Sequence, residues 1–462
     1  MPQRYEGWRA YQESLKKRQR KKERRASLIA GMKKSGFGLV ILLLVGAAAF
    51  GLWPHGSAKK EAPAEVPQET GLSPEVVHSL LPADQMATST RQAYSATVEG
   101  APVTVSTTLN IELQEFLISE FKRNIAKKRG TPRYVSAVAM DAQTGRVIAL
   151  AGISGDKGSV NPSLEAHYPA ASLFKIVTAS AAVETLGLSP TSKLNFNGGK
   201  YTLYKRQLTN KKNRYTNTIT LRDSFAQSVN PVFGKLGALR LKKEKLAAYG
   251  DKFFFNRPID FDLPVQPSVL TLEDKPYQWA EVACGFNRTT LISPLHGALL
   301  ASAAANGGVI PAPILVESVV DNEAKELYSA NTHPLGRVTS SKSAQAVQKL
   351  MERTIRSGTA KKSFSGYRRD AVLKNLTLGG KTGSIFNRDR DVRVDWFVGF
   401  AKEKKTGRTL AVSVVVGHQK YIGTRAAQYA RMAITNFFSQ PPVQKMDGGT
   451  KVAASGTSQT AG

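Results

Sequence analysis

Residues 172–175 read SLFK and place a hydroxyl and an amine three residues apart, just after Pro169. Proline favours the first turn of a helix, and residues three apart share one helix face. We therefore expect a helix over residues 169–186 that brings Ser172 and Lys175 together. The helix N-terminus also favours negative charge that develops on the serine oxygen. The segment predicts a serine nucleophile beside its base.

The neighbours of this motif are apolar on nearly all sides. They are Leu173, Phe174, Ile176, Val177, Ala179, Ala181, Ala182 and Val183. A lysine buried among such residues loses its hydration, which lowers its pKa toward the range of a general base. The alternative is an ordinary core helix whose lysine extends its ammonium group to solvent.

The pattern Ser-x-x-Lys is weak by itself, because it occurs five times in this chain. The other copies begin at Ser14, Ser57, Ser119 and Ser154. The first two fall in a basic leader and a proline-rich tether. The third lies in mid-helix beside charged residues, and the fourth lies in a glycine-rich stretch. We therefore favour the copy at Ser172.

Two further motifs occur along the chain. Ser-x-Asn occurs at residues 159–161, 228–230 and 329–331, and Lys-Thr-Gly occurs at residues 381–383 and 405–407. The last of these lies in a charged run between two strands, which favours a solvated turn. The copy at 381–383 follows an apolar strand and two glycines, which leave room for a substrate backbone beside the strand.

The order of the expected elements predicts the fold class. Periodicity predicts strands at 104–109, 134–141, 146–152, 376–378, 396–401 and 409–416, and helices at 110–128, 169–186, 221–239, 295–305 and 425–438. The second and third strands form an antiparallel hairpin around a glycine-containing turn. A hairpin first, helices in the middle and strands last predict an α/β (α+β) domain. Its mainly antiparallel central sheet is flanked by helices and closed by C-terminal strands.

The N-terminal region has the features of a membrane anchor. Residues 1–36 carry twelve Lys or Arg against three Glu, and residues 37–53 read FGLVILLLVGAAAFGLW, seventeen residues without a charge. About 17–25 apolar residues span a bilayer as a helix, and the flanking positive charge stays in the cytoplasm. We expect a basic cytoplasmic leader and a single transmembrane helix, with the rest outside the cytoplasmic membrane. The alternative is a signal peptide cleaved near Ala47-Ala48-Ala49.

Two further segments complete the expected organisation. Residues 54–103 begin with a stretch rich in Pro, Ala and Glu, which predicts an extracytoplasmic tether or stub. Residues 439–462 are rich in Gly, Ser, Thr and Ala, which predicts a disordered tail. The folded domain is expected over residues 104–438.

Charge and cysteine content narrow the classes of partner. Lys and Arg number 65 against 35 Asp and Glu, a formal net charge of +30. This excess favours nucleic acid, an anionic membrane surface or an acidic polymer. The charges lack the aromatic interleaving of a single-strand binder, so we expect no nucleic-acid partner. The single cysteine, Cys284, excludes an intramolecular disulfide and a cysteine-rich zinc site.

Taken in order, residues 172–175, 228–230 and 381–384 resemble the three motifs of penicillin-binding proteins and serine β-lactamases. Flanking phrases are similar to the transpeptidase domain: TLISPLHGALLASAAANGG (290–308), RSGTAKKSFSG (356–366), GGKTGS (379–384) and DWFVGFA (395–401). The resemblance covers residues 104–438 and implies a penicillin-binding/serine β-lactamase-like fold. It fits a monofunctional, class B-like member with a reduced N-terminal domain, because too few residues precede the hairpin for a glycosyltransferase or a pedestal domain.

The resemblance implies a role for each matched residue. Ser172 would attack the penultimate D-Ala carbonyl of a stem peptide, and Lys175 would accept its proton. Ser228 would relay protons to the leaving amine, and Asn230 would hold the lysine and the substrate amide. Lys381 would supply positive potential for the terminal carboxylate.

The strand motif would complete the substrate site. Thr382, Gly383 and Ser384 would bind the substrate, with the two hydroxyls on the terminal carboxylate. Backbone N–H groups of Ser172 and Ser384 would form the oxyanion hole. Serine stands at 384 where the family more often has threonine, and it keeps the hydroxyl. No metal and no cofactor are expected.

The implied function is peptidoglycan D,D-transpeptidation through a serine acyl-enzyme. The implied partners are stem peptides, lipid-linked or nascent glycan, β-lactams as inhibitors, and a SEDS-family glycan polymerase or another cell-wall synthesis protein. A D,D-carboxypeptidase or endopeptidase would use the same residues with water as the acceptor, and a β-lactamase would deacylate rapidly. A non-catalytic envelope or divisome scaffold is the alternative from another class.

Overall fold

The computed structural model describes residues 71–126, 129–156, 158–388 and 391–440. The described residues belong to one compact unit. The predicted leader 1–36 and anchor 37–53 lie outside the described residues, as does nearly all of the predicted tail. Within the described ranges, no helix is both long and apolar enough to cross a bilayer.

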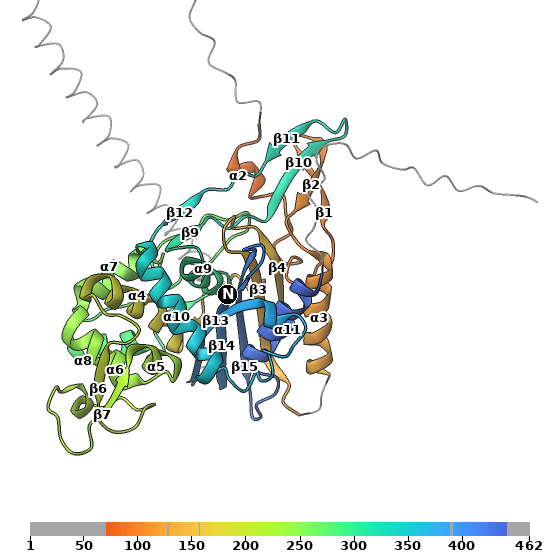
Figure 1. Ribbon diagram of the computed structural model, residues 1–462. Helices are drawn as coiled ribbons and strands as arrows, with labels where there is room; N and C mark the ends of the chain where they lie inside the picture. The colour runs from red at the N-terminus through yellow and green to blue at the C-terminus, as the bar shows by residue number, and fades with distance from the viewer. Residues whose placement is uncertain (1–70, 127–128, 157, 389–390, 441–462) are drawn as a thin grey trace, which may run out of the picture. The chain divides into compact units, whose positions relative to one another are not determined.

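The centre of this unit is a five-stranded antiparallel sheet (Figure 1). Its order is β13-β14-β15-β3-β4, with β3 (Pro132–Asp141), β4 (Val147–Ser154), β13 (Leu376–Asn387), β14 (Val392–Glu403) and β15 (Thr409–His418). The predicted hairpin and the closure of the sheet by C-terminal strands are confirmed. In the described part of the chain, β13 pairs with β14 alone and so forms one edge of the sheet.

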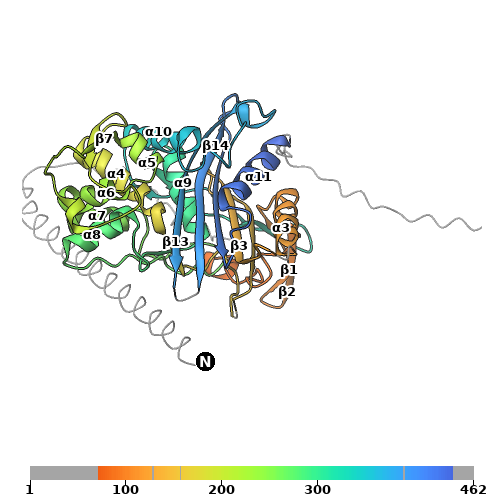
Figure 2. The ribbon, with the colours of Figure 1, turned by 90° about the horizontal axis from the view of Figure 1, so that it is seen from below.

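Side chains of the sheet alternate between two cores on its opposite faces. Trp396 on β14 packs in the core that contains α4 (Lys175–Leu186), α8 (Pro276–Cys284) and α9 (Pro294–Ala305). The next residue, Phe397, packs in the core that contains α3 (Ile111–Ile125) and α11 (Ala426–Ser439). Figure 2 shows the sheet between these two groups of helices. Strands buried on both faces are apolar without alternation, as β15 is.

Two of the predicted helices show local start signals that hold in the structure. The side chain of Asn110 accepts from the backbone N–H of Leu113 at the start of α3. The side chain of Ser293 accepts from the N–H of His296 at the start of α9. Such caps satisfy backbone donors that a helix leaves unpaired. The helices expected at 110–128 and 295–305 are therefore confirmed within a few residues.

The predicted helix 169–186 begins later than expected. Tyr168–Pro169 form strand β5, which pairs with β8 (Leu291–Ile292). The 3-10 turn η1 (Ala171–Phe174) follows, and α4 starts only at Lys175. Proline fits the first turn of a helix, but it also fits a short edge strand, because it lacks the N–H that a longer ladder would use. The helix start inferred from Pro169 was wrong.

The predicted helix 221–239 is broken in the structure. It consists of α5 (Leu221–Ala226), α6 (Asn230–Lys235) and the π-helical turn η3 (Leu236–Leu241), and α7 (Lys242–Lys252) follows. Between α5 and α6, Ser228 has φ +55°, which no right-handed helix accommodates. The break therefore falls on the Ser-x-Asn motif.

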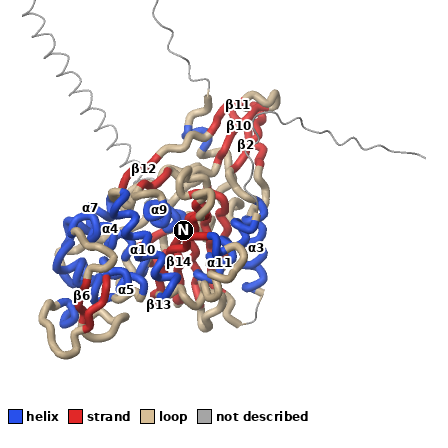
Figure 3. Tube along the Cα trace, in the orientation of Figure 1, coloured by secondary structure: helices blue, strands red, loops and turns tan. Residues whose placement is uncertain are grey.

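Residues 71–103 belong to the folded unit, although the sequence predicted a tether or stub over residues 54–103. They contain α2 (Pro74–Val77), β1 (Ala93–Val98) and the beginning of β2 (Ala101–Thr107). These strands join β10 (Val316–Asp321) and β11 (Glu326–Ser329) in a four-stranded antiparallel sheet (Figure 3). The prediction failed because β2 pairs with β10, a strand more than 200 residues later in the chain.

The remaining elements surround the central sheet. They are the hairpin β6 (Lys193–Phe196) and β7 (Asn217–Thr220), the pair β9 (Val309–Pro311) and β12 (Pro334–Arg337), helix α10 (Ser341–Ser357), and the 3-10 turns η2 (Lys205–Leu208) and η4 (Leu373–Asn375). Helix α10 packs against α5 and β13. It thereby connects the segment that carries Ser228 with the strand that carries Lys381.

Candidate active site

The candidate nucleophile Ser172 lies in the turn η1, directly before α4, and is partly exposed. The preceding residue, Ala171, has φ +48°, an uncommon value for a residue with a Cβ. Gly285 packs against this turn: a Cβ there would lie 1.8 Å from the Ala171 carbonyl oxygen and 2.8 Å from the Ser172 nitrogen. Only glycine fits at position 285, so the turn that presents the serine depends on it.

Lys175 is completely buried, with 0% of its surface exposed. Its Nζ donates to Ser172 Oγ and to Asn230 Oδ1, both at 2.9 Å, and to the backbone carbonyl of Cys284. The spacing of three residues therefore brings amine and hydroxyl together, although the serine lies in the 3-10 turn and only the lysine lies in the α-helix.

The break between α5 and α6 brings the second motif to the same point. Ser228 Oγ donates to Ser172 Oγ at 2.9 Å. Asn230 opens α6; its Oδ1 accepts from Lys175, and its Nδ2 donates to the carbonyl of Tyr201 at 3.0 Å. The strained backbone at Ser228 turns its hydroxyl toward the nucleophile, as strain at functional sites often does.

The third motif arrives on the edge strand β13. Lys381 is completely buried, and its Nζ donates to Ser228 Oγ at 3.0 Å and to the Thr382 carbonyl at 2.7 Å. One chain of hydrogen bonds therefore joins Lys381, Ser228, Ser172 and Lys175, from three segments far apart in the sequence.

Both lysines have depressed pKa values. Burial lowers the pKa of Lys175 to about 8. Burial, and after it the charge of Lys175, lowers the pKa of Lys381 well below its ordinary value. Each ammonium also lies over an aromatic ring, Lys175 over Phe233 and Lys381 over Phe225, both at 5.6 Å from the ring centroid. With a pKa of about 8, a minor fraction of Lys175 is a neutral amine beside the Ser172 hydroxyl near neutral pH, and the fraction grows as the pH rises.

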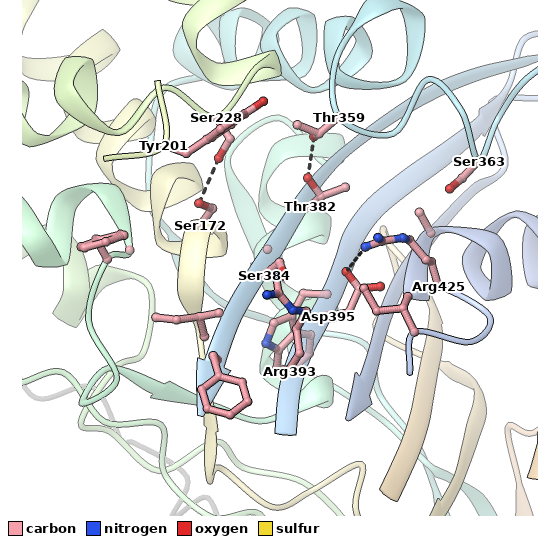
Figure 4. Close-up of a pocket in the computed structure, with 18 of the residues that line it drawn as sticks. Ser172, Tyr201, Ser228, Thr359, Ser363, Thr382, Ser384, Arg393, Asp395 and Arg425 are labelled. Carbon is pink, nitrogen blue, oxygen red and sulfur yellow. Dashed lines mark hydrogen bonds and ion pairs between the residues drawn. The ribbon is translucent and has the colours of Figure 1, made fainter. Parts of the chain in front are cut away.

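Ser172 and Ser228, the two hydroxyls of this chain, line a cleft of about 1030 Å³, and the two lysines lie buried behind them. Figure 4 shows Ser172 and Ser228 on one side of β13, and the bonded pair Thr359 and Thr382 beside the strand. Ser384 lies further along β13 and is exposed. A Cβ at Gly383 would lie 3.4 Å from the Ala170 carbonyl oxygen, which is ordinary van der Waals contact, so the strand lies directly beside the nucleophile turn.

The family described as "Penicillin binding protein transpeptidase domain" matches residues 135–436. The chain belongs to this family. The resemblance inferred from the three motifs is confirmed.

Curated relatives of the chain include members of the family from several bacteria. It is 25% identical over 291 residues to Stage V sporulation protein D of Bacillus subtilis, across 60% of this chain and 43% of that protein. It is 23% identical over 284 residues to peptidoglycan D,D-transpeptidase PbpA of Mycobacterium tuberculosis, across 58% of this chain and 54% of that protein. The chain thus spans about half the length of these relatives.

Solved structures with this fold include other transpeptidase domains. The D,D-transpeptidase domain of a peptidoglycan glycosyltransferase from Eggerthella lenta has a TM-score of 0.59 at 22% identity, covering 78% of this chain and 91% of that chain. Penicillin-binding protein A from M. tuberculosis also has a TM-score of 0.59, at 21% identity, covering 73% of this chain and 82% of that chain.

Among the described residues, other copies of the motifs begin at Ser119, Ser159, Ser329 and Lys405, and none of these residues lines the cleft. Ser119 donates to a carbonyl of its own helix, and Ser159 donates to Glu165. Ser329 ends β11, and Lys405 lies in the turn between β14 and β15. Context in the sequence set aside the copies at Ser119 and Lys405, whereas the copies at Ser159 and Ser329 were set aside only by the resemblance to the family.

Sequence analysis missed the contributions of the backbone to the site. The carbonyls of Cys284 and Tyr201 hold Lys175 and Asn230, and Gly285 supports the nucleophile turn. No side-chain pattern marks a carbonyl acceptor, so these groups had no signal in the sequence. Thr359 did have one, since it lies within the phrase 356–366 that resembles the family.

Proposed function

We propose that this chain is a serine D,D-transpeptidase that cross-links peptidoglycan stem peptides. The observation that carries the proposal is the chain of hydrogen bonds from Lys381 through Ser228 and Ser172 to Lys175, at the base of an open cleft. A relative named peptidoglycan D,D-transpeptidase and a fold neighbour described as an imipenem acyl-enzyme complex support it.

Acylation follows from the position of Lys175. When its amine is neutral, Ser172 donates its O–H to the Nζ lone pair across the 2.9 Å contact. The serine oxygen then attacks the penultimate D-Ala carbonyl, and the proton moves to Lys175. A C–O bond forms and the peptide C–N bond breaks. Ser228 passes its proton to the departing D-Ala amine and takes one from protonated Lys381 across the 3.0 Å contact, while Lys175 keeps the proton from Ser172.

Electrostatics assist both the substrate and the transition state. When Lys175 is neutral, its charge no longer lowers the pKa of Lys381. We infer that Lys381 then carries the proton and, with the Thr382 and Ser384 hydroxyls on the same edge strand, attracts the terminal carboxylate. The N–H groups of Ser172 and Ser384 would receive the developing oxyanion, and such a donor is typically worth about 2.7–4 kcal/mol. An edge strand also permits the peptide to pair with its backbone.

Completion of the reaction needs an acceptor. In transpeptidation an amine of a second stem peptide attacks the acyl carbonyl, the bond to Ser172 breaks, and a cross-link forms. With water as the acceptor the same site would be a carboxypeptidase or endopeptidase, and rapid hydrolysis of β-lactam adducts would make it a β-lactamase. We infer transpeptidation from the names of the relatives.

We further propose that residues 37–53 anchor the chain in the cytoplasmic membrane, with leader 1–36 inside and the catalytic unit outside. Residues 54–70 would form the tether, and the tail would begin after Ser439. Nascent or lipid-linked glycan would be the substrate polymer, and a SEDS-family polymerase or another cell-wall protein would be the partner. These proposals depend on the uncharged segment and its basic flank.

A transfer assay tests the proposed reaction. The full chain is incubated with a synthetic peptide that ends in D-Ala-D-Ala and with an amine acceptor, and the products are separated by mass. We expect the peptide–acceptor amide in wild type and its absence in Ser172→Ala. Hydrolysed peptide without any amide would assign a carboxypeptidase instead. No release of D-Ala and no penicillin adduct would leave only the scaffold.

A further inference from the structure

Beyond β13, as seen from Ser172, the cleft carries a second group of charged residues. Lys362, Arg393 and Arg425 line it, and they come from the α10–β13 connection, strand β14 and the start of α11. We propose that these three side chains form a subsite for a second carboxylate of the stem peptide, one that is not the terminal carboxylate. The inference rests on the proposed function, because it names a further group of the same substrate.

Strand register fixes where this subsite lies. Ser384 on β13 is directly opposite Asp395 on β14, and Phe386 is directly opposite Arg393. Residues opposite each other share a face of the sheet, with Cβ atoms about 4.5–5.5 Å apart. Figure 4 shows Arg393, Asp395 and Arg425 on the far side of β13 from Ser172. Any group bound to Arg393 and Arg425 therefore lies next to Ser384 and away from the reacting carbonyl.

Asp395 is a positioning residue in this arrangement. Its side chain is only 8% exposed; its Oδ2 accepts from the Ala426 N–H at 3.0 Å and lies 3.5 Å from His418 Nε2. Arg425 Nη1 lies 3.7 Å from its Oδ1. The Asp395 carboxylate thus accepts a hydrogen bond from the first turn of α11. The same carboxylate holds the Arg425 guanidinium at the wall of the cleft.

The three positive charges of the subsite outnumber the single negative charge of Asp395. In the described part of the chain, neither Lys362 nor Arg393 has an acidic partner within 4.0 Å. The Arg425 side chain is 47% exposed, and one ion pair leaves most of its five donors open. Cations gathered on a concave wall raise the local concentration of anions, and guanidinium groups match the two oxygens of a carboxylate.

The second carboxylate and the terminal carboxylate of the peptide would lie at different positions along β13. The proposed receptor for the terminal group is Lys381 with Thr382 and Ser384, which lie nearest the nucleophile. Arg393 is opposite Phe386, the next residue beyond Ser384 on the same face. The ligand of the cationic wall is therefore a carboxylate carried by an acidic side chain of the peptide.

The test compares peptides that differ in one carboxylate. Three synthetic peptides end in D-Ala-D-Ala: one with a free side-chain carboxylate, one amidated there, and one amidated at its C-terminus. The full-length wild type, the double variant Arg393→Gln/Arg425→Gln and the control Arg91→Gln, an exposed arginine outside the cleft, are assayed for release of the terminal residue. The rate of fluorescent penicillin labelling is measured in parallel.

We expect side-chain amidation to raise KM about tenfold in wild type and control, with kcat little changed, because one charge-assisted contact is lost. The double variant should treat the free and side-chain amidated peptides alike and should label with penicillin at the wild-type rate. Equal KM values for these two peptides in wild type would overturn the inference alone. A double variant that no longer responds to C-terminal amidation and labels slowly would place the terminal carboxylate on the arginines and would also overturn the inference. Absence of labelling in every protein would overturn the proposed function itself.

Discussion

Two lysines share one buried site around Ser172, and neither is paired with a carboxylate among the described residues. Lys175 is held by a hydroxyl, an amide oxygen and a carbonyl, and Lys381 by a hydroxyl and a carbonyl. Neutral acceptors of this kind orient an ammonium without stabilising its charge as a carboxylate would. A buried amine in such surroundings gives up its proton readily.

Replacement of Lys175 by alanine should nearly abolish acylation. General-base assistance contributes about 10²–10⁴ in rate, so penicillin labelling should slow by at least about a hundredfold. Circular dichroism should show the wild-type spectrum. The exposed Lys342→Ala on α10 is the matched control and should label normally. Normal labelling of Lys175→Ala would remove this lysine from the mechanism.

The pH dependence of acylation should report the same amine. Burial lowers the pKa of Lys175 to about 8, and the base is the neutral form. The second-order rate of penicillin labelling should therefore rise as pH increases from 6 and level off above about pH 8. Stopped-flow measurements on wild type would show this, and the residual rate of Lys175→Ala should lack the inflection. A wild-type rate that falls over this range is inconsistent with Lys175 as the base.

At this scale the sequence predicted side chains better than backbone groups. Ser172, Lys175, Ser228, Asn230 and Lys381 were found because their residue types occur at fixed spacings within short motifs. The carbonyl acceptors were not found, because every residue has a carbonyl and only the fold decides which one faces the lysine.

At the scale of elements, the nucleophile depends on how η1 packs against the end of α8. Gly285 ends that helix with φ +67°, and its missing side chain leaves room for the Ala171 carbonyl. Edge strand β13 approaches from another direction at Gly383. Three elements thus meet closely around one serine, and Gly285 is the glycine whose missing side chain allows it.

Gly285→Ala should therefore slow acylation more than its loss of folding stability alone would explain. Alanine in the left-handed region costs about 1–2 kcal/mol, and the 1.8 Å clash would also displace the turn that holds Ser172. Gly187→Ala, at φ +63° with no atom within 4 Å, carries the same backbone cost without the clash. Denaturant unfolding and penicillin labelling should show slow acylation only in Gly285→Ala. Equal labelling of the two variants would mean that the turn does not depend on Gly285.

Elements with a periodic pattern and a local cap were predicted well, and those shaped by tertiary contacts were not. α9 has both its Ser293 cap and a continuous apolar run. The nucleophile segment has a similar composition, but pairing of β5 with β8 draws Pro169 into a strand. The break near Ser228 had a signal in the sequence, since Pro231 does not fit the interior of a continuous helix and instead lies in the first turn of α6. The positive φ at Ser228 had no such signal.

At the scale of the whole molecule, one sheet separates two cores. The first core includes the N-terminal hairpin through Tyr94, Val103 and Val105, and the second lies under α3 and α11. The order of elements was enough to predict the sheet and its helical layers. It could not place residues 71–103, because their partner strand β10 lies far along the chain.

A chain limited to residues 71–440 should fold and react as the full chain does. Both cores and all the residues around Ser172 lie within this range. We expect a single cooperative unfolding transition and an unchanged rate of penicillin labelling. A shorter chain that starts at residue 104 should lose stability, because Tyr94 and Val103 leave the core. If both chains unfold alike, the hairpin contributes nothing to the fold.

The central claim is that three distant segments converge on one reactive hydroxyl at Ser172. Mass spectrometry of the penicillin-treated full chain, digested into peptides, tests it most directly. The account predicts a long-lived adduct on the peptide that contains Ser172, and no adduct in Ser172→Ala. An adduct on any other serine, or none on the wild-type protein, would contradict it.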